Sequence, residues 1–200
     1  PTLECFAFRS GDRGRTWETL PTRVSPPPGY NCVAIDGQAP VRFPDDTLVV
    51  PAWVDNRNTG SLRDRNDATI ALYGSDDHGI AWKYLAEVVR DPTTWGRPGY
   101  ANLLLLPSGQ LQCYFNRIGG IRNDIELTSS DDGGYSWSAP QPIVAWGRSP
   151  WAARHRPGAR RDGVFYRSPW PVRLRDGRIV VLFARRKSPS GIGLIVSEDD

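Results

Sequence analysis

Residues 10–17 read SGDRGRTW, and the same pattern, Ser-x-Asp-x-Gly-x-x-Trp, returns at residues 75–82 (SDDHGIAW) and 130–137 (SDDGGYSW). Residues 197–200 (SEDD) begin the phrase a fourth time. The leading serines are 65, 55 and 67 residues apart, which is too long for a simple solenoid repeat but suits a four-stranded propeller blade with variable loops. The repeat therefore predicts an all-β fold before it says anything about function.

Each phrase has the chemistry of a hairpin turn that joins two strands. The aspartate at its third position accepts hydrogen bonds from backbone N–H groups further along, and the glycine at its fifth position adopts a positive φ without strain. The closing tryptophan is large and apolar, so we expect it to pack between neighbouring sheets. These residues are predicted to stabilise the fold and not to catalyse a reaction. They are Asp12 and Trp17, Asp77 and Trp82, and Asp132 and Trp137.

The stretches between the phrases repeat one internal order. Strand-like runs at residues 102–107, 111–116 and 124–129 precede the third phrase, and another run follows it at residues 142–146. Helical periodicity is absent, so we expect one partial β-propeller domain built from consecutive four-stranded meanders. Within the domain, at residues 1–200, the blades are predicted at residues 1–24 (the end of one blade), 33–91, 99–146 and 164–200 (the start of a fourth).

Arginine supplies almost all of the positive charge of the chain. The net charge is only +3, and Lys83 and Lys187 are the only lysines. Arginine pairs with carboxylates and phosphates through parallel hydrogen bonds, so the bias fits an anionic ligand, and genome composition explains it equally well. A basic insertion at residues 147–166 lacks regularly spaced aromatic residues, and a nucleic-acid partner is therefore not expected.

Cysteine usage and hydropathy exclude several other classes of protein. Cys5, Cys32 and Cys113 are widely separated, which does not fit a disulfide framework or a zinc site. We expect neither a metal nor a cofactor. No run of 18 apolar residues occurs, so no membrane span is predicted. We expect a secreted or periplasmic protein, and the sequence leaves its oligomeric state open.

Arginine recurs where the second strand of each predicted blade ends. The examples are Arg57, Arg117 and the adjacent Arg185 and Arg186. Equivalent positions around a propeller axis would converge on one anion. The alternative is that these side chains simply extend from strand ends into solvent, as arginine usually does.

The repeated phrase resembles the Asp box of the sialidase (neuraminidase) superfamily. In that family the box joins the third and fourth strands of each blade, on the rim away from the active site. The resemblance implies a six-bladed propeller, of which about three and a half blades fall within this sequence. The box indicates the propeller fold and not sialidase activity, because the same box also occurs in propellers that are not sialidases.

The resemblance extends to the stretch at residues 38–67. It is similar to the first catalytic blade of bacterial sialidases, in which an Arg-Ile-Pro motif precedes an Asp-x-Arg-x-Thr-Gly loop and an acid/base aspartate. The likeness implies that Arg57 lines the substrate pocket and that Asp64 or Asp67 is the acid/base carboxylate. This chain has Gln38 where the family has the arginine of that motif, and a glutamine cannot neutralise a carboxylate. Arg42, on the same predicted strand, is the candidate replacement.

The same likeness assigns pocket residues in the following blades. Tyr100 stands where the family often has a glutamate that assists a tyrosine nucleophile, and we expect it in the pocket. Arg117 and Arg186 are the expected second and third arginines of the carboxylate-binding triad. The nucleophile itself would belong to a later blade.

Two classes of function fit these residues. The first is a glycoside hydrolase of the sialidase type that cleaves a terminal acidic sugar, with an aspartate delivering the proton to the glycosidic oxygen. The second is a non-catalytic propeller that binds carbohydrate or protein, a reading that the glutamine at position 38 favours. A lyase or another polysaccharide-active propeller keeps the anionic-sugar ligand and changes only the chemistry.

Overall fold

The computed structural model of the 200-residue chain describes residues 2–35, 38–56, 68–90, 97–118, 124–144, 165–186 and 190–197. In this part of the chain the regular elements are all β-strands. The strands are β1 (Cys5–Ala7), β2 (Thr22–Val24), β3 (Cys32–Ala34), β4 (Val41–Arg42), β5 (Leu48–Asp55), β6 (Thr69–Ser75), β7 (Lys83–Arg90), β8 (Arg97–Leu105), β9 (Leu111–Ile118), β10 (Ile125–Ser130), β11 (Gln141–Val144), β12 (Phe165–Arg173), β13 (Ile179–Arg186) and β14 (Gly191–Val196). The predicted all-β fold is confirmed.

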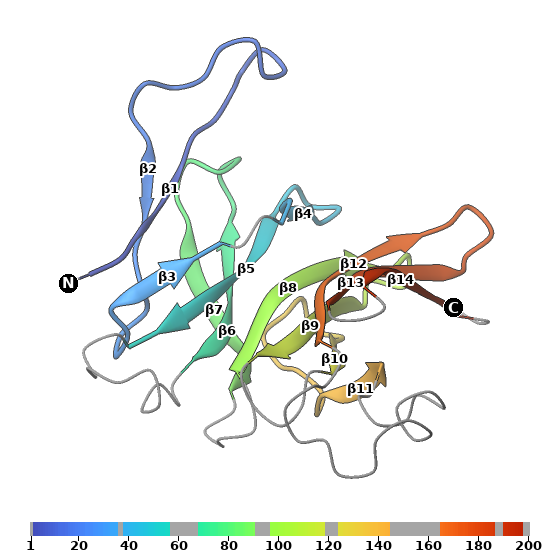
Figure 1. The fold of residues 1–200 in the computed structure, drawn as a ribbon. Helices are drawn as coiled ribbons and strands as arrows, with labels where there is room; N and C mark the ends of the chain where they lie inside the picture. The colour runs from blue at the N-terminus through green and yellow to red at the C-terminus, as the bar shows by residue number, and fades with distance from the viewer. Residues whose placement is uncertain are drawn as a thin grey trace, which may run out of the picture.

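The strands form four sheets that follow one another across the molecule in chain order (Figure 1). The first sheet is β1–β2, the second holds β3 to β7, the third is β8–β9–β10–β11 and the fourth is β12–β13–β14. Sequential strands pair antiparallel throughout these sheets. Each full sheet is thus an up-and-down meander, which is the architecture of a propeller blade.

The first strand of each of the last three sheets is interrupted at an equivalent place. In the second sheet it is split into β3 and β4, which pair with opposite halves of β5. In β8 one extra residue lies between Gly99 and Asn102, where Tyr100 has a φ of 50°. In β12 the extra residue lies between Arg167 and Trp170, and a neighbouring serine has a φ of 53°. Both interruptions are β-bulges, which bend a strand and re-aim the side chains beside them.

The hydrophobic core lies between successive sheets. Phe115 and Leu72, both fully buried, pack in one cluster between the second and third sheets. Val181 and Tyr114 belong to the cluster between the third and fourth sheets. Alternate residues of each strand face one neighbouring sheet, so stacking the sheets removes these apolar faces from water.

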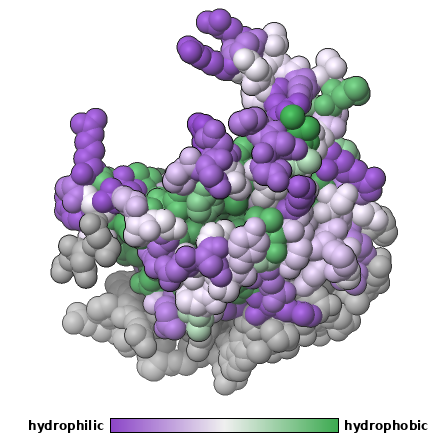
Figure 2. All heavy atoms as spheres, turned by 180° about the vertical axis from the view of Figure 1, so that it is seen from behind, coloured by the Kyte–Doolittle hydropathy of each residue, from purple (hydrophilic) through white to green (hydrophobic). Residues whose placement is uncertain are grey.

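The fourth sheet is apolar on both of its faces. Trp170, Leu182 and Leu194 are cross-strand partners, so they share one face, and each is exposed. The opposite face carries residues such as Val181, which pack on the third sheet. Figure 2 shows hydrophobic residues exposed among the polar residues on one face of the molecule. A sheet with two apolar faces is typical of a layer packed between two others.

The three complete phrases have one hydrogen-bond pattern. In the third, the Ser130 hydroxyl donates to Asp132 Oδ1 at 2.7 Å and accepts from the Gly134 N–H at 2.8 Å. Asp132 also accepts from the backbone N–H of Ser136 at 2.9 Å. The corresponding bonds recur in the first and second phrases. These turns therefore hold the aspartate as a structural acceptor, as the sequence predicted from its chemistry.

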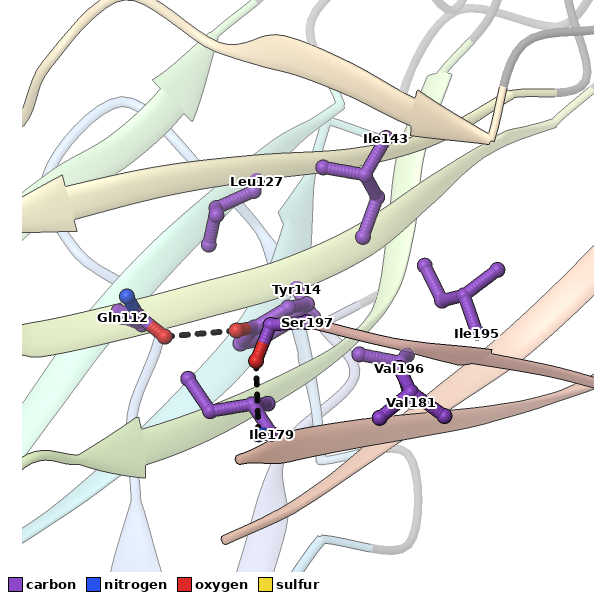
Figure 3. Close-up of a pocket in the computed structure, with 9 residues that line it drawn as sticks. All are labelled: Gln112, Tyr114, Leu127, Ile143, Ile179, Val181, Ile195, Val196 and Ser197. Carbon is purple, nitrogen blue, oxygen red and sulfur yellow. Dashed lines mark hydrogen bonds between the residues drawn. The ribbon is translucent and has the colours of Figure 1, made fainter. Parts of the chain in front are cut away.

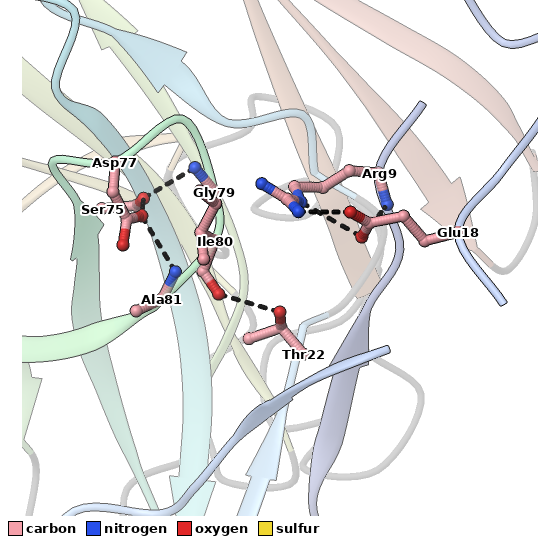
Figure 4. A network of polar contacts seen from close by, with 8 residues as sticks. All are labelled: Arg9, Glu18, Thr22, Ser75, Asp77, Gly79, Ile80 and Ala81. Carbon is pink, nitrogen blue, oxygen red and sulfur yellow. Dashed lines mark hydrogen bonds and ion pairs between the residues drawn. The ribbon is translucent and has the colours of Figure 1, made fainter. Parts of the chain in front are cut away.

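The boxes also tie neighbouring sheets together. Figure 4 shows the second box beside the first sheet, where Thr22 Oγ1 donates to the Ile80 carbonyl at 2.8 Å. Trp82 and Trp137 are partly buried and pack against the clusters on the preceding side of their sheets. Trp17 departs from the predicted packing and is 61% exposed, because the described chain places no sheet before β1–β2.

Hydrogen bonds lower the pKa of all three box aspartates. The Thr16 backbone N–H, the Thr16 hydroxyl and the Ser10 hydroxyl together lower the pKa of Asp12 to about 2. The Ser136 hydroxyl and backbone N–H hold the pKa of Asp132 well below its usual range. Each aspartate is thus stabilised in its ionised form by the turn that it organises.

We expect Asp132→Ala to lower the Tm of the protein by several degrees at pH 7, since it removes the acceptor of the third box. A carboxyl whose pKa is lowered in the folded state stabilises the fold above its unfolded pKa of about 4 and loses that contribution as the pH falls through the folded value. The difference in Tm between wild type and variant should therefore shrink below about pH 4. Thermal melts at pH 7 and pH 2.5 measure it. The matched control is Asp131→Ala, which removes one exposed bond to Gln110; an equal loss in both variants would contradict the prediction.

Candidate functional site

The sheets have two distinct ends. Leu111 pairs with Ser130 at the end that carries the third box, and Asn116 pairs with Ile125 at the other end. The tight turn between β8 and β9 lies with the box, because Gln110 Nε2 donates to Asp131 Oδ1 at 2.9 Å. The opposite end gathers the starts of β8 and β12 and the ends of β5, β9 and β13. Three of the described sequence-predicted site residues, Tyr100, Arg117 and Arg186, belong to this end, called here the distal end.

Gln38 bridges the second and third sheets. With its amide oriented to satisfy both groups, its nitrogen donates to the Ala101 carbonyl at 2.6 Å and its oxygen accepts from the Leu103 N–H. β8 is the edge strand of its sheet, so the side chain extends the pairing of an otherwise open edge. The amide is neutral and its polar groups are occupied by the backbone of β8. Gln38 therefore supplies no positive charge at the place where the resemblance led us to look for an arginine.

Arg42 is placed at the opposite end of the molecule from the other candidates. Its Nε donates to Asp46 Oδ1 at 2.8 Å across the β4–β5 turn, and its side chain is 66% exposed. Leu48, its cross-strand partner, also pairs with the first residue of the second box. The structure thus brings Arg42 to the box end and does not bring it together with Tyr100 or Arg117.

Arg117 is held in a buried ion pair at the end of β9. Its Nε and Nη2 each donate to one carboxylate oxygen of Glu126 at 2.9 Å, and the two side chains are 10% and 4% exposed. The guanidinium also lies over the Phe115 ring, 5.8 Å from its centroid. Two parallel bonds fix the plane of the guanidinium, so Arg117 is rigidly presented. Glu126 was noted in the sequence only as a nearby glutamate, because alternation without a register does not say where it points.

The strand register identifies which arginines of neighbouring sheets are equivalent. Arg117 is six residues beyond the start of β9, and Arg185 is six residues beyond the start of β13. Both starting residues lie beside the serine that opens a box. Arg185 is half-buried and Arg186, the predicted triad member, is exposed. The register therefore matches Arg117 with Arg185.

Tyr100 lies at the bulge of β8, half-buried at the distal end. The guanidinium of Arg167 lies over its ring, 5.6 Å from the centroid. Arg167 was not among the predicted site residues. The bulge of β8 lies as far before the β8–β9 turn as the bulge of β12 lies before the β12–β13 turn, so the two bulges are equivalent. This equivalence is the signal that could have identified Arg167.

Three predicted residues, Arg57, Asp64 and Asp67, lie outside the described residues. Within the described ranges, no group of three or more His, Cys, Asp or Glu side chains could hold a metal ion. Nor does this part of the chain contain a helix that is long and apolar enough to span a membrane.

A cavity of about 350 Å³ separates the third and fourth sheets (Figure 3). Its lining is mainly apolar, and its polar groups bond one another: Tyr114 Oη donates to Gln112 Oε1 at 2.6 Å, and Ser197 Oγ accepts from the Ile179 N–H at 2.8 Å. Ser197, which lines the cavity, is the first residue of the fourth phrase, so the cavity lies at the box end of the sheets. Trp137 packs in the corresponding interface between the second and third sheets. The cavity is therefore a gap in inter-sheet packing, away from Tyr100 and Arg167.

The chain belongs to the BNR repeat-like domain family, whose pattern matches residues 2–200. It is 35% identical over 82 residues to an anhydrosialidase of Macrobdella decora, a match that covers 41% of this chain and 10% of the relative. This family assignment and the repeated boxes together confirm the resemblance inferred from the sequence.

Several solved structures are similar to this chain. A Dyadobacter fermentans protein of unknown function matches with a TM-score of 0.71 at 19% identity, over 96% of this chain and 47% of that one. An α-L-arabinanase of Penicillium chrysogenum complexed with arabinobiose matches with a TM-score of 0.66 at 17% identity, over 100% and 56%. The Hadza microbial sialidase Hz136 matches with a TM-score of 0.63 at 18% identity, over 98% and 34%. These likenesses confirm the sialidase-type propeller fold, and the chain spans from a third to just over half of these structures.

Proposed function

We propose that this chain is part of an exo-acting glycoside hydrolase of the sialidase type that cleaves a terminal acidic sugar. The observation that carries the proposal is the gathering of Arg117, Arg185 and Arg167 at the distal ends of neighbouring sheets, beside Tyr100. Planar guanidinium groups bind carboxylates through paired hydrogen bonds, and an aromatic ring stacks on the apolar face of a sugar. The anhydrosialidase and sialidase among the relatives support the same class of ligand.

The chemistry proposed is proton delivery to the glycosidic oxygen by a loop aspartate. Asp64 and Asp67 remain the predicted acid/base residues, and either would need a pKa raised by partial burial to donate at neutral pH. The arginines would bind and orient the acidic group so that the scissile bond meets this carboxylate.

A neutral-sugar hydrolase is the second candidate, and Gln38 favours it. The Gln38 amide is bonded to the backbone of β8 and adds no charge to the site. The arabinanase complexed with arabinobiose shows that a propeller similar to this chain takes a neutral pentose ligand.

The experiment is release of a fluorescent aglycone by the full protein from three glycosides, those of N-acetylneuraminic acid, glucuronic acid and α-L-arabinofuranose. We expect turnover of at least one acidic glycoside and none of the arabinofuranoside. Turnover of the arabinofuranoside alone would establish the second candidate. Binding of acidic sugar without release would indicate a non-catalytic propeller, and an unsaturated product from a uronic-acid polymer would indicate a lyase; both outcomes contradict the proposal.

A further inference from the structure

Arg167 differs from every other described arginine in how its charge is accommodated. Several described arginines pair with the carboxylate of another described residue, among them Arg9, Arg23, Arg42, Arg117 and Arg178. Among the described arginines, Arg167 alone combines half-burial with a side chain that makes no hydrogen bond or ion pair to a described residue. Partial removal of a cation from water is unfavourable unless a partner compensates it. The Tyr100 ring offsets part of this cost through its negative face.

The contact with Tyr100 leaves the hydrogen-bonding groups of Arg167 available. The guanidinium carbon lies 5.6 Å from the ring centroid, and the Arg167 side chain donates no hydrogen bond to a described residue. These donors match the two oxygens of a carboxylate. The contact with Tyr100 thus orients Arg167 and leaves a bidentate anion site at its edge.

The backbone that positions this pair is strained on both sides. Tyr100 and Ser168 have φ values of 50° and 53°, a conformation that non-glycine residues rarely adopt. The Ser168 N–H donates to Oδ1 of the fully buried Asn116 at 3.3 Å, which fixes the bulge of β12 against the third sheet. Strain held in place by its surroundings is concentrated at ligand-binding sites.

The pair also adjoins the position that lacks an arginine. Gln38 bonds the backbone at Ala101 and Leu103, and Tyr100 immediately precedes that stretch. Gln38, between β3 and β4, thus adjoins the stretch of β8 that follows Tyr100, and Tyr100 in turn contacts Arg167 of β12. The charge that position 38 does not supply is present at Arg167, two sheets further along.

We propose that Arg167, oriented by Tyr100, binds the carboxylate of the sugar ligand and sets the preference for an acidic over a neutral sugar. This inference rests on the proposed class of ligand and names the residue that selects it. It differs from the strand-end arginines to which the sialidase resemblance led, because Arg167 lies on the first strand of its sheet.

The test is calorimetric titration of the full protein with N-acetylneuraminic acid and glucuronic acid, each compared with its uncharged methyl ester. For each acid that binds, the wild-type protein should bind the acid more tightly than its methyl ester. Arg167→Gln should weaken acid binding by about 10- to 100-fold and leave ester binding unchanged, since it removes a charge-assisted bidentate contact. Arg167→Lys should retain part of the preference, because it keeps the charge and loses the planar donors.

Matched controls separate ligand contact from folding. Arg178→Gln removes an arginine from the same sheet, at the exposed β12–β13 turn, and should leave acid binding unchanged. Tyr100→Leu removes the ring that orients Arg167 and should weaken acid binding more than Tyr100→Phe, which keeps the ring. Thermal melts should show each variant folded.

The inference is overturned if Arg167→Gln keeps the wild-type preference for the acid, or if wild type binds neither acid or binds acid and ester equally. The experiment reads binding and not hydrolysis. Acid binding through Arg167 without any aglycone release would refute the proposed hydrolase and leave the inference standing. Hydrolysis of an acidic glycoside by a fully active Arg167→Gln variant would support the proposed hydrolase and refute the inference about Arg167.

Discussion

Glu126→Ala is expected to lower the free energy of unfolding by about 3 to 5 kcal/mol. The change leaves the guanidinium of Arg117, whose side chain is only 10% exposed, without its bidentate carboxylate. Removing one member of a buried ion pair costs far more than the pair itself contributes, because the remaining charge stays in a poorly solvated position. Urea denaturation of the full protein measures the loss.

The matched variant replaces both partners. Arg117→Met combined with Glu126→Leu should recover most of the lost stability, since apolar side chains of similar size need no solvation. Asp176→Ala, which breaks the exposed pair with Arg178, should change stability little. A Glu126→Ala protein as stable as wild type would show that the pair is not buried. For the same reason, Arg117→Ala cannot be read as a pure binding variant unless its stability is measured alongside.

Gly134→Ala is expected to cost about 2 to 4 kcal/mol, of which strain at positive φ accounts for about 1 and crowding for the rest. Gly134 has a φ of 99°, and an added Cβ would overlap Leu72 Cδ2 and approach Leu111 Cδ2 to 3.4 Å. Leu72 is fully buried between the second and third sheets and has no room to withdraw. Chemical denaturation would report the loss.

Gly133→Ala is the control within the same box. Gly133 has a φ of 80°, and an added Cβ would meet nothing within 4 Å. It should therefore cost only the backbone strain, about 1 kcal/mol. Equal losses at Gly133 and Gly134 would mean that the third box does not pack against the preceding sheet.

The part of the fold that the sequence predicted is the part built from local interactions. The Ser, Asp and Gly of each box bond within a few residues of one another, so their spacing alone indicates where two strands turn. Trp82 and Trp137 pack where their size and position in the repeat placed them. Trp17 carries the same local signal, and only the absence of a sheet before β1–β2 in the described chain explains its exposure.

The candidate site was harder to predict, because it depends on register between strands. Alternation places Arg117 and Glu126 on faces of β9 and β10, but only the pairing of Phe115 with Glu126 brings them together. The bulges of β8 and β12 each insert a residue and so change which side chains face the distal end. Arg167 contacts Tyr100 beside these insertions, and their equivalent distances from the following turns can be recognised only once the bulges are known.

The site proposed here is most directly tested by a crystal structure of the full protein with bound N-acetylneuraminic acid. We expect the sugar at the distal end of the sheets, with its carboxylate about 3 Å from the guanidinium of Arg167 and its ring beside Tyr100. A sugar seated at the box end or in the cavity between the third and fourth sheets, or a carboxylate turned away from Arg167, would contradict the account.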